Sequence, residues 1–150
     1  YNTITEGSSM SKTIKIKCNS CKYKVSLKEG ITSLDTKDML LNVDNELANA
    51  YNLLSKIKTK ALKTKVVHMI HDGATLADTY GYQIMRCPEC GELTSHFVFT
   101  LQTKEETFSP TYYCKTCKHK LNKISYTTAL KGKCPKCHQK LVYVDTTYDD

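Results

Sequence analysis

Eight cysteines arranged as four Cys-x-x-Cys pairs are the residues of this chain best suited to do chemistry. Two intervening residues let both sulfurs of a pair reach one metal ion at about 2.3 Å, and four thiolates make a closed tetrahedral zinc site with no open position. We therefore predict two structural zinc ions per chain, with every cysteine a ligand. The pairs, numbered first to fourth along the chain, are Cys18/Cys21, Cys87/Cys90, Cys114/Cys117 and Cys134/Cys137.

Sequence spacing leaves open which pairs share an ion. We favour a sequential arrangement, in which the first pair joins the second and the third joins the fourth. The sixteen residues between the third and fourth pairs are long enough for a strand, a turn and a returning strand. In a nested arrangement the second pair joins the third, and the first joins the fourth. An interleaved arrangement is the remaining possibility, and all three use the same eight ligands.

Length and composition fit small domains that depend on metal. The 150 residues include no Trp and only three Phe, so the apolar core is small and metal binding must supply part of the folding free energy. Paired cysteines without a secretory signal indicate a reducing compartment, and no apolar run approaches the length of a membrane span. We expect a cytoplasmic protein with no membrane partner. Eight thiolates and two zinc ions would reduce the formal charge from +7 to about +3.

Short strands and one long helix are expected to position the cysteine pairs. Alternating apolar and polar residues predict the strands. Apolar residues spaced three and four apart from Leu40 to Ala61 predict one amphipathic helix over residues 36–67, with Asp35 or Thr36 as its N-cap. The acidic residues 145–150 are predicted to form a loose tail. The expected strands cover residues 13–17, 23–27, 82–85, 93–101, 108–113, 121–126 and 141–144.

The residues around the second and fourth pairs resemble the zinc-ribbon superfamily, which includes rubredoxin-like knuckles. The matching segments are Arg-Cys-Pro-Glu-Cys-Gly at 86–91 and Lys-Cys-Pro-Lys-Cys at 133–137, and the resemblance extends over about half of the chain. Gly91 stands where such a knuckle favours a residue with positive φ. Lys22, Lys118 and His138 follow the other pairs and depart from this pattern. The resemblance implies a fold more than a function.

With this resemblance, the elements predict an α+β fold of two zinc-ribbon modules of short antiparallel strands with one long inserted helix. We expect residues 1–9 to be a leader or disordered tail before a native start at Met10. The remaining segments are 10–35 with the first knuckle and its strands, 36–72 with the helical insertion, 73–113 with the second knuckle and a hairpin, and 114–150 with a C-terminal zinc ribbon and the acidic tail.

A narrower resemblance concerns the polar hairpin tip at residues 103–107, which looks like the ribbon of transcript-cleavage elongation factors. In that family an acidic pair at the tip enters the polymerase site and helps hold a metal ion. Glu105 and Glu106 stand where Asp-Glu would be expected, and Lys104 replaces the neighbouring arginine. A charged β-turn explains the same residues, and we favour that interpretation.

Lysines and tyrosines around the third and fourth pairs favour nucleic acid as a partner. No acidic residue lies between Cys114 and Lys140. Lysines would neutralise phosphates and tyrosines could stack on unpaired bases. Arg86 is the only arginine, which leaves little for bidentate reading of base edges. The candidate contact residues are Lys115, Lys118, Lys120, Lys123, Lys131, Lys133, Lys136, Tyr113 and Tyr126.

Other functions compete with nucleic-acid binding. A protein–protein adaptor or regulator would use the apolar stripe of the 36–67 helix and the ribbon edges, and the same stripe could form a homodimer. Iron in a four-cysteine site would make a redox protein. The sequence contains no Gly-rich phosphate loop, no His-Glu metal motif and no nucleophile elbow, so we expect no enzymatic activity. His68 and His71 could share a metal ion, but eight cysteines already suffice for two.

Overall fold

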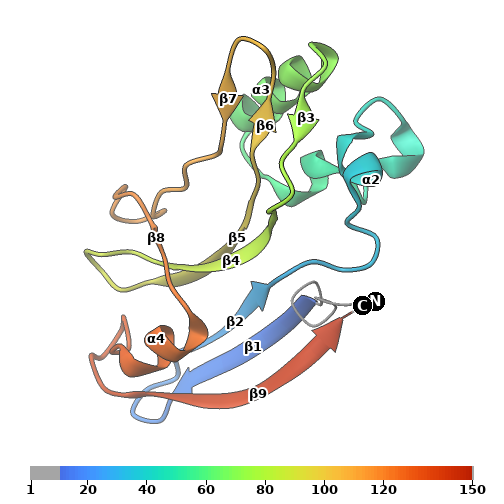
Figure 1. The fold of residues 1–150 in the computed structure, drawn as a ribbon. Coiled ribbons are helices and arrows are strands. Elements are labelled where there is room, and N and C mark those ends of the chain that lie inside the picture. Colours follow the sequence, from blue (N-terminus) through green and yellow to red (C-terminus); the bar gives the residue numbers. More distant parts are fainter. Residues whose placement is uncertain (1–10, 150) are drawn as a thin grey trace.

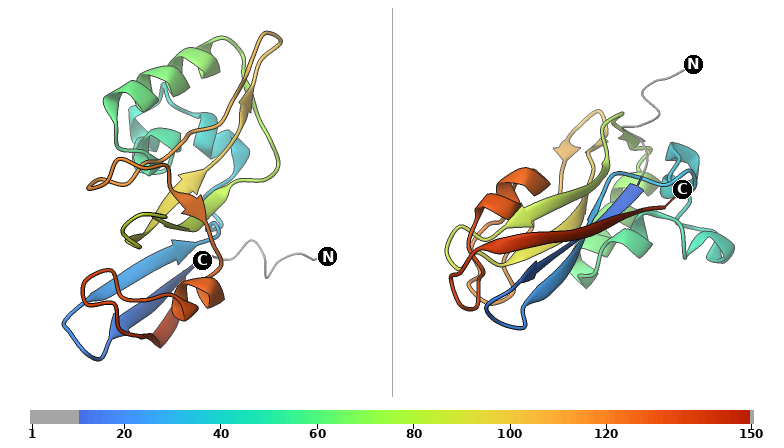
Figure 2. Two further views of the ribbon diagram at one scale, coloured as in Figure 1. Left: turned by 90° about the vertical axis from the view of Figure 1, so that its left-hand side faces the viewer. Right: turned by 90° about the horizontal axis from the view of Figure 1, so that it is seen from below.

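The computed structural model describes residues 11–149, so the expected leader at 1–9 and the native start at Met10 lie outside the described residues. Short helices and three small antiparallel sheets make up the fold, in agreement with the α+β class. In Figure 1 and in the left panel of Figure 2, the sheet of β1, β2 and β9 lies at one end of the molecule. Helix α3 and the β6–β7 hairpin lie at the other end.

The outer sheet has the strand order β2-β1-β9 and consists of β1 (Ser11–Cys18), β2 (Lys24–Glu29) and β9 (Leu141–Asp149). Ile14 and Ile16 of β1 are buried, and Lys15 and Lys17, which alternate with them, are exposed, as the alternation predicts. The prediction of a loose acidic tail is wrong, because β9 pairs with β1 as far as the Ser11–Asp149 pair. The β-favouring Val, Thr and Tyr residues of this segment outweigh its acidic charge.

The inner sheet has the order β5-β4-β8 and consists of β4 (Gly81–Arg86), β5 (Leu93–Val98) and β8 (Asn122–Lys123). Its buried Ile84 and Leu93 pack in one core with Ile14 and Leu141 of the outer sheet. The two sheets also meet at a bridge between Gly30 and Tyr82, whose amides and carbonyls exchange hydrogen bonds of 3.0 and 2.9 Å. The inner and outer sheets therefore share one apolar interior.

Glycine is required at position 81 by the close approach of the chain after β2. Gly81 has φ of +147°, and a Cβ atom there would lie 3.0 Å from Cγ2 of Ile31 and 3.2 Å from the carbonyl oxygen of Gly30. Both contacts are tighter than side chains normally tolerate, so the absent side chain lets the bridge to Tyr82 form.

The two sheets with cysteine pairs have the same order and the same register. Lys17 and Arg86, each just before the first cysteine of a hairpin, pair with Lys24 and Leu93, six residues after that cysteine. On the other side, Lys17 pairs with Val142 and Arg86 with Asn122, and both partners stand five residues after the last cysteine of a later pair. The chain therefore builds one three-stranded unit twice, with the inner copy inserted into the outer one.

A third sheet with α3 forms a separate core around Phe97 and Phe99. The sheet has the order β3-β6-β7 and consists of β3 (Thr75–Leu76), β6 (Leu101–Gln102) and β7 (Thr107–Phe108). Helix α3 (Lys60–His71) begins at the N-cap Thr59 and buries Val66 and Met69 against these aromatic rings. Of the predicted strand at 108–113 only the first residue, Phe108, belongs to a strand, and Pro110 two residues later cannot continue the ladder.

The prediction of one long helix over 36–67 is wrong. The segment forms α2 (Lys37–Leu41), two 3₁₀ turns, η1 (Glu46–Ala48) and η2 (Leu53–Lys56), and then α3. Thr36 caps α2 as predicted, but Asn45 accepts a hydrogen bond from the amide of Leu47 and starts η1. Asparagine and aspartate favour caps and turns over helix interiors, and this segment has four Asn and two Asp.

The apolar residues of the predicted helix therefore do not form one continuous stripe, because the segment is divided among several short elements. Leu40 and Ile57 are buried in the core, but Leu47 is 88% exposed. A homodimer through the 36–67 segment stays a prediction, and it cannot use one continuous helix. None of the helices within residues 11–149 is long and apolar enough to cross a membrane.

The link between the third and fourth cysteine pairs also differs from its prediction. In place of a strand over 121–126, the chain forms the two-residue β8 and then α4 (Tyr126–Lys131), capped by the side chain of Ser125. The buried Ala129 of α4 packs into the core shared by the outer and inner sheets. The link thus carries the chain from the inner sheet to the outer sheet and does not return as a hairpin.

Candidate metal centres

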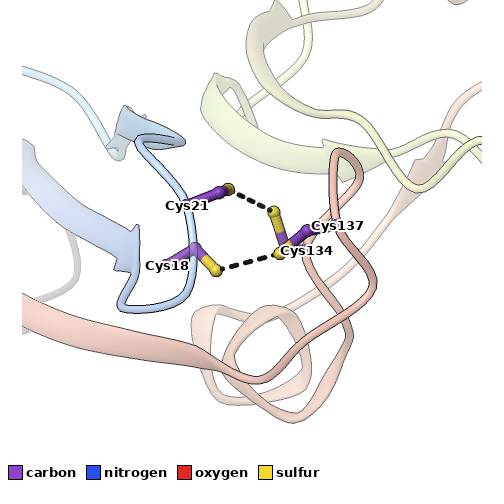
Figure 3. Close-up of side chains that lie close together, drawn as sticks. All are labelled: Cys18, Cys21, Cys134 and Cys137. Atoms are coloured by element: carbon purple, nitrogen blue, oxygen red, sulfur yellow. Dashed lines mark hydrogen bonds between the residues drawn. The ribbon is translucent and has the colours of Figure 1, made fainter.

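The eight cysteines come together as two groups of four, and they do so in the nested arrangement. The outer tetrad consists of Cys18, Cys21, Cys134 and Cys137, and the inner tetrad of Cys87, Cys90, Cys114 and Cys117. Within each tetrad the four sulfurs all lie within 4.8 Å of one another. Figure 3 shows the outer tetrad, with its two pairs on separate turns and their sulfurs directed toward one another.

The sequential arrangement that the spacing favoured is therefore wrong. It assumed a hairpin between Cys117 and Cys134, but β8 pairs with β4 of the inner sheet. That pairing brings the third cysteine pair to the second. Strand β9 pairs with β1, and this brings the fourth pair to the first.

Three of the four knuckles share one backbone conformation. Gly91 has φ of 79°, as the resemblance implied, and Lys118 and His138 adopt φ of 64° and 65° at the equivalent position. In each of these knuckles the amide of that residue donates a 2.9 Å hydrogen bond to the carbonyl of the pair's first cysteine. Lys118 and His138 therefore differ from the glycine of the pattern in residue type but not in backbone conformation. A side chain at such a position lowers the stability of the fold by about 1 kcal/mol relative to glycine.

The knuckles also direct amides at the sulfurs. The amides of Ser20 and Lys136 lie 3.3 Å from Sγ of Cys18 and of Cys134. The amide of Cys117 lies 3.4 Å from Sγ of Cys114. Such N–H···S contacts stabilise thiolate over thiol and are the usual outer-shell support of a metal-bound cysteine.

Electrostatics limits how many outer thiols can ionise together. Burial opposes ionisation of Cys18, but hydrogen bonds from the Ser20 amide and from neighbouring thiols prevail and lower its pKa to about 7. The Gln139 amide lowers the pKa of Cys137, but the other thiols and burial outweigh it and raise that pKa to about 12.

The inner tetrad shows the same division. The amide of Cys117 and further hydrogen bonds lower the pKa of Cys114 to about 7. Interaction with the thiol of Cys90, followed by burial, raises the pKa of Cys117 to about 12. Four thiolates so close together require a compensating cation, because each one disfavours the next.

The tetrads fit a tetrahedral metal ion. Four sulfurs at about 2.3 Å from a zinc ion would be separated by about 3.8 Å. The sulfurs of Cys18 and Cys137 are 3.4 Å apart, and those of Cys21 and Cys134, and of Cys90 and Cys114, are 3.7 Å apart. These distances are far longer than the bond of about 2.0 Å in a disulfide. Both tetrads are therefore consistent with zinc-ribbon-like metal sites.

The predicted nucleic-acid contact residues are exposed, with one exception, and some of them line two different hollows. Tyr113 is 59% exposed, whereas Tyr126 packs on the shared core beneath the ammonium group of Lys12. Lys133 lines a hollow of about 510 Å³ that also contains Cys87 of the inner tetrad and Cys134 of the outer one. The exposed lysines of the set are Lys115, Lys118, Lys120, Lys123, Lys131, Lys133 and Lys136.

A second and larger hollow joins two of these residues to a group that the sequence interpretation missed. It has a volume of about 870 Å³ and is lined by three segments far apart in the sequence, within residues 55–65, 82–96 and 108–115. Of its lining residues, Lys115 and Tyr113 were predicted from the sequence as nucleic-acid contacts. Its other basic and aromatic lining residues are Lys56, Lys58, Lys65, Tyr82, His96, Phe108 and Tyr112. No local motif indicated these residues, because only the fold brings the segments together.

The two lesser metal candidates are engaged in other contacts. At the tip of the β6–β7 hairpin, Glu106 forms an ion pair of 2.9 Å with Lys65 of α3, so this acidic residue is held against its own chain. His68 lies 3.3 Å from Asp72 of the same turn, and His71 lies 2.7 Å from Asp44. Each histidine thus has a carboxylate partner of its own.

Comparisons of this chain with protein-family models, with curated proteins and with solved structures gave no match.

Proposed function

We propose that each tetrad holds one structural zinc ion and that the protein is a non-enzymatic binding protein folded around these two ions. The observation that carries this proposal is the convergence of all eight cysteines into two groups with their sulfurs within 4.8 Å. Four thiolate ligands suit zinc and leave no coordination position open for a water molecule or a substrate. Zinc in such sites contributes folding free energy and no chemistry.

The proposed partner is nucleic acid. The lysines around the third and fourth cysteine pairs are exposed, and no acidic residue interrupts the sequence from Cys114 to Lys140. Exposed lysines bind phosphates by releasing counterions, which makes the affinity fall steeply with salt. The expected affinity is therefore highest at low ionic strength and largely independent of base sequence.

Two measurements test this proposal in order. Elemental mass spectrometry of the purified protein should find two zinc ions per chain, and a strong chelator should remove the dispersed amide signals of the folded state. Iron in the tetrads would overturn the assignment of zinc and favour a redox protein. A salt titration against single- and double-stranded DNA and RNA should then show binding that weakens with salt. If the metal-loaded protein binds none of these nucleic acids at low salt, nucleic acid is refuted as the partner.

One observation favours a protein partner as the second candidate. Strand β9 pairs with β1 along one edge, and no strand of the described residues pairs with its other edge. Tyr143, Val144 and Tyr148 of this strand are each more than 40% exposed. A second copy of the chain or another extended segment could add a strand there. Self-association in analytical ultracentrifugation, in protein that does not bind nucleic acid, would support this alternative.

A further inference from the structure

We propose that the 870 Å³ hollow beside α3 is a groove for single-stranded nucleic acid, in which an unpaired base stacks on the aromatic lining and lysines at the rim hold the phosphates. This inference rests on the proposed function and gives it a location. The groove is bounded by η2 and the start of α3, by strands β4 and β5, and by the segment from Phe108 to Lys115.

The charge of the groove favours an anionic occupant. Four lysines line it, namely Lys56, Lys58, Lys65 and Lys115, and no carboxylate group of the described residues does. Lys56 and Lys65 are already paired, with Asp35 and Glu106. Among the side chains that the structure describes, no carboxylate lies at ion-pair distance from Lys58 or Lys115, and both lysines are exposed. These two ammonium groups are therefore available for phosphates.

The aromatic lining favours a base over a simple anion. His96 and Tyr112 stack on each other, with ring centroids 4.4 Å apart and an angle of 14° between their planes. The hydroxyl group of Tyr112 donates a hydrogen bond to the carbonyl of Phe97, which fixes this pair to β5. Tyr113 is the next residue and is 59% exposed, so its ring is free to stack on a base.

His96 adds an uncharged stacking surface to the groove. Burial, followed by the positive charge of Lys58, lowers the pKa of this imidazole below its ordinary value. The ring is therefore neutral at neutral pH and leaves the phosphate contacts to the lysines.

Two lysine ammonium groups also lie over aromatic rings of the lining, although Lys28 itself does not line the groove. The ammonium group of Lys28 lies 4.9 Å from the ring centroid of Tyr82, and that of Lys65 lies 5.7 Å from the ring centroid of Phe108. Cations next to aromatic faces are the combination by which single strands are held without reading their sequence. A duplex buries its bases, so it cannot use these rings.

The test measures the affinity of the zinc-loaded protein for oligo(dT) and oligo(rU) of about 12 nucleotides, within the range that one small binding fold covers. Fluorescence anisotropy at several salt concentrations gives both the affinity and the salt slope. Tyr113→Ala should weaken binding about tenfold, and Tyr113→Phe should restore it, because the ring remains. Lys58→Ala and Lys115→Ala should each reduce the salt slope by about 0.7.

Lys24→Ala and Lys104→Ala are the matched controls, since both lysines are exposed, neither lines the groove and neither belongs to the candidate contacts around the third and fourth cysteine pairs. They should change affinity and slope less than the groove variants. All variants should retain two zinc ions, which checks their folding. Equal affinities for oligo(dT) and oligo(rU) indicate a general single-strand groove, and a higher affinity for one shows whether the groove favours DNA or RNA.

Two results would overturn the groove while leaving the proposed function intact. One is nucleic-acid binding that Lys131→Ala or Lys136→Ala weakens and the groove variants do not. The other is duplex binding as tight as single-strand binding, with no loss on Tyr113→Ala. A parent protein that loads two zinc ions but binds no nucleic acid at low salt would overturn the proposed function as well.

Discussion

Two double substitutions test the nested pairing of the cysteines directly. C90S/C117S removes two ligands from the inner tetrad and leaves the outer tetrad complete. C117S/C137S removes one ligand from each tetrad and leaves neither complete. In a sequential pairing these two outcomes would be exchanged, so the experiment separates the arrangements even though both variants lose two cysteines.

The size of the effect follows from the strength of structural zinc sites. Binding of about 10–16 kcal/mol shared among four thiolates corresponds to about 2.5–4 kcal/mol per ligand, or two to three orders of magnitude in affinity. A chelator of intermediate strength should therefore leave one zinc ion in C90S/C117S and none in C117S/C137S. Native mass spectrometry after chelation counts the retained ions. One retained ion in C117S/C137S, with none in C90S/C117S, would refute the nested arrangement.

The two tetrads should also differ in what their loss does to the fold. Cys18 and Cys134 belong to the buried core that the outer sheet, the inner sheet and α4 share, together with Ile14 and Ile84. In the cluster of the inner tetrad, Met85 and Leu121 are the only buried residues besides Cys87 and Cys114. Removing the outer site should therefore cost the β1 and β9 amides of the outer sheet their protection, which hydrogen exchange can show. Equal loss of protection in C18S and C114S would contradict this reasoning.

Three further predictions concern single residues. The ammonium group of Lys56 lies 3.0 Å from the Asp35 carboxylate, which is 2% exposed. Asp35→Ala removes this partner, so urea unfolding should show a free energy of unfolding lower by about 3–5 kcal/mol. Gly91→Ala should cost about 1 kcal/mol and Lys118→Gly should recover up to about 1 kcal/mol, because both positions have φ above 60°; opposite signs would show that the knuckle backbone differs from the one described. Burial lowers the pKa of His96 in the folded state. The stabilising contribution of His96 should therefore fall as the pH drops through the unfolded pKa of about 6.5, and it should be fully lost below the folded pKa. An NMR titration that gives His96 a pKa of about 6.5 or higher in the folded protein would contradict this.

Sequence patterns predicted the strands of this fold better than its helices. Alternation located β1, β2 and β4 within about two residues, because one face of each strand is buried and the period of two is imposed by the core. The apolar spacing in residues 40–61 matched a helix equally well, but Asn45 and Asn52 begin 3₁₀ turns within it. The spacing of apolar residues indicates which side chains are buried, but it contains no information on the local side-chain hydrogen bonds that end a helix.

The cysteine pairing could not be derived from spacing, because spacing within a pair is local and pairing between pairs depends on sheet order. A signal was nevertheless present in the sequence. The third and fourth pairs share the pattern Cys-x-x-Cys-x-x-Lys-Leu, which ends at Leu121 and Leu141, and both leucines are buried at equivalent positions. Two segments with the same pattern indicate the same role in two copies of one unit. Each would then need its own earlier knuckle, which argues against their sharing one ion.

The nested arrangement also predicts the order in which the ions are bound during folding. The inner sulfurs of Cys90 and Cys114 are 24 residues apart in sequence, whereas the outer sulfurs of Cys18 and Cys137 are 119 residues apart. Closing the longer loop costs about 1.4 kcal/mol more, which is about a tenfold difference in affinity.

One equivalent of zinc added to the metal-free protein should therefore fill the inner tetrad first. Amide signals of β4 and β5 should then appear before those of β1 and β9, because the outer sheet needs the last strand of the chain. Completion of the inner sheet brings Ile84 and Leu93 into place, and these are the residues on which the outer sheet packs. Simultaneous appearance of both sets of signals would mean that the shared core couples the two sites by more than the difference in loop closure. The nested units would then fold as one cooperative structure.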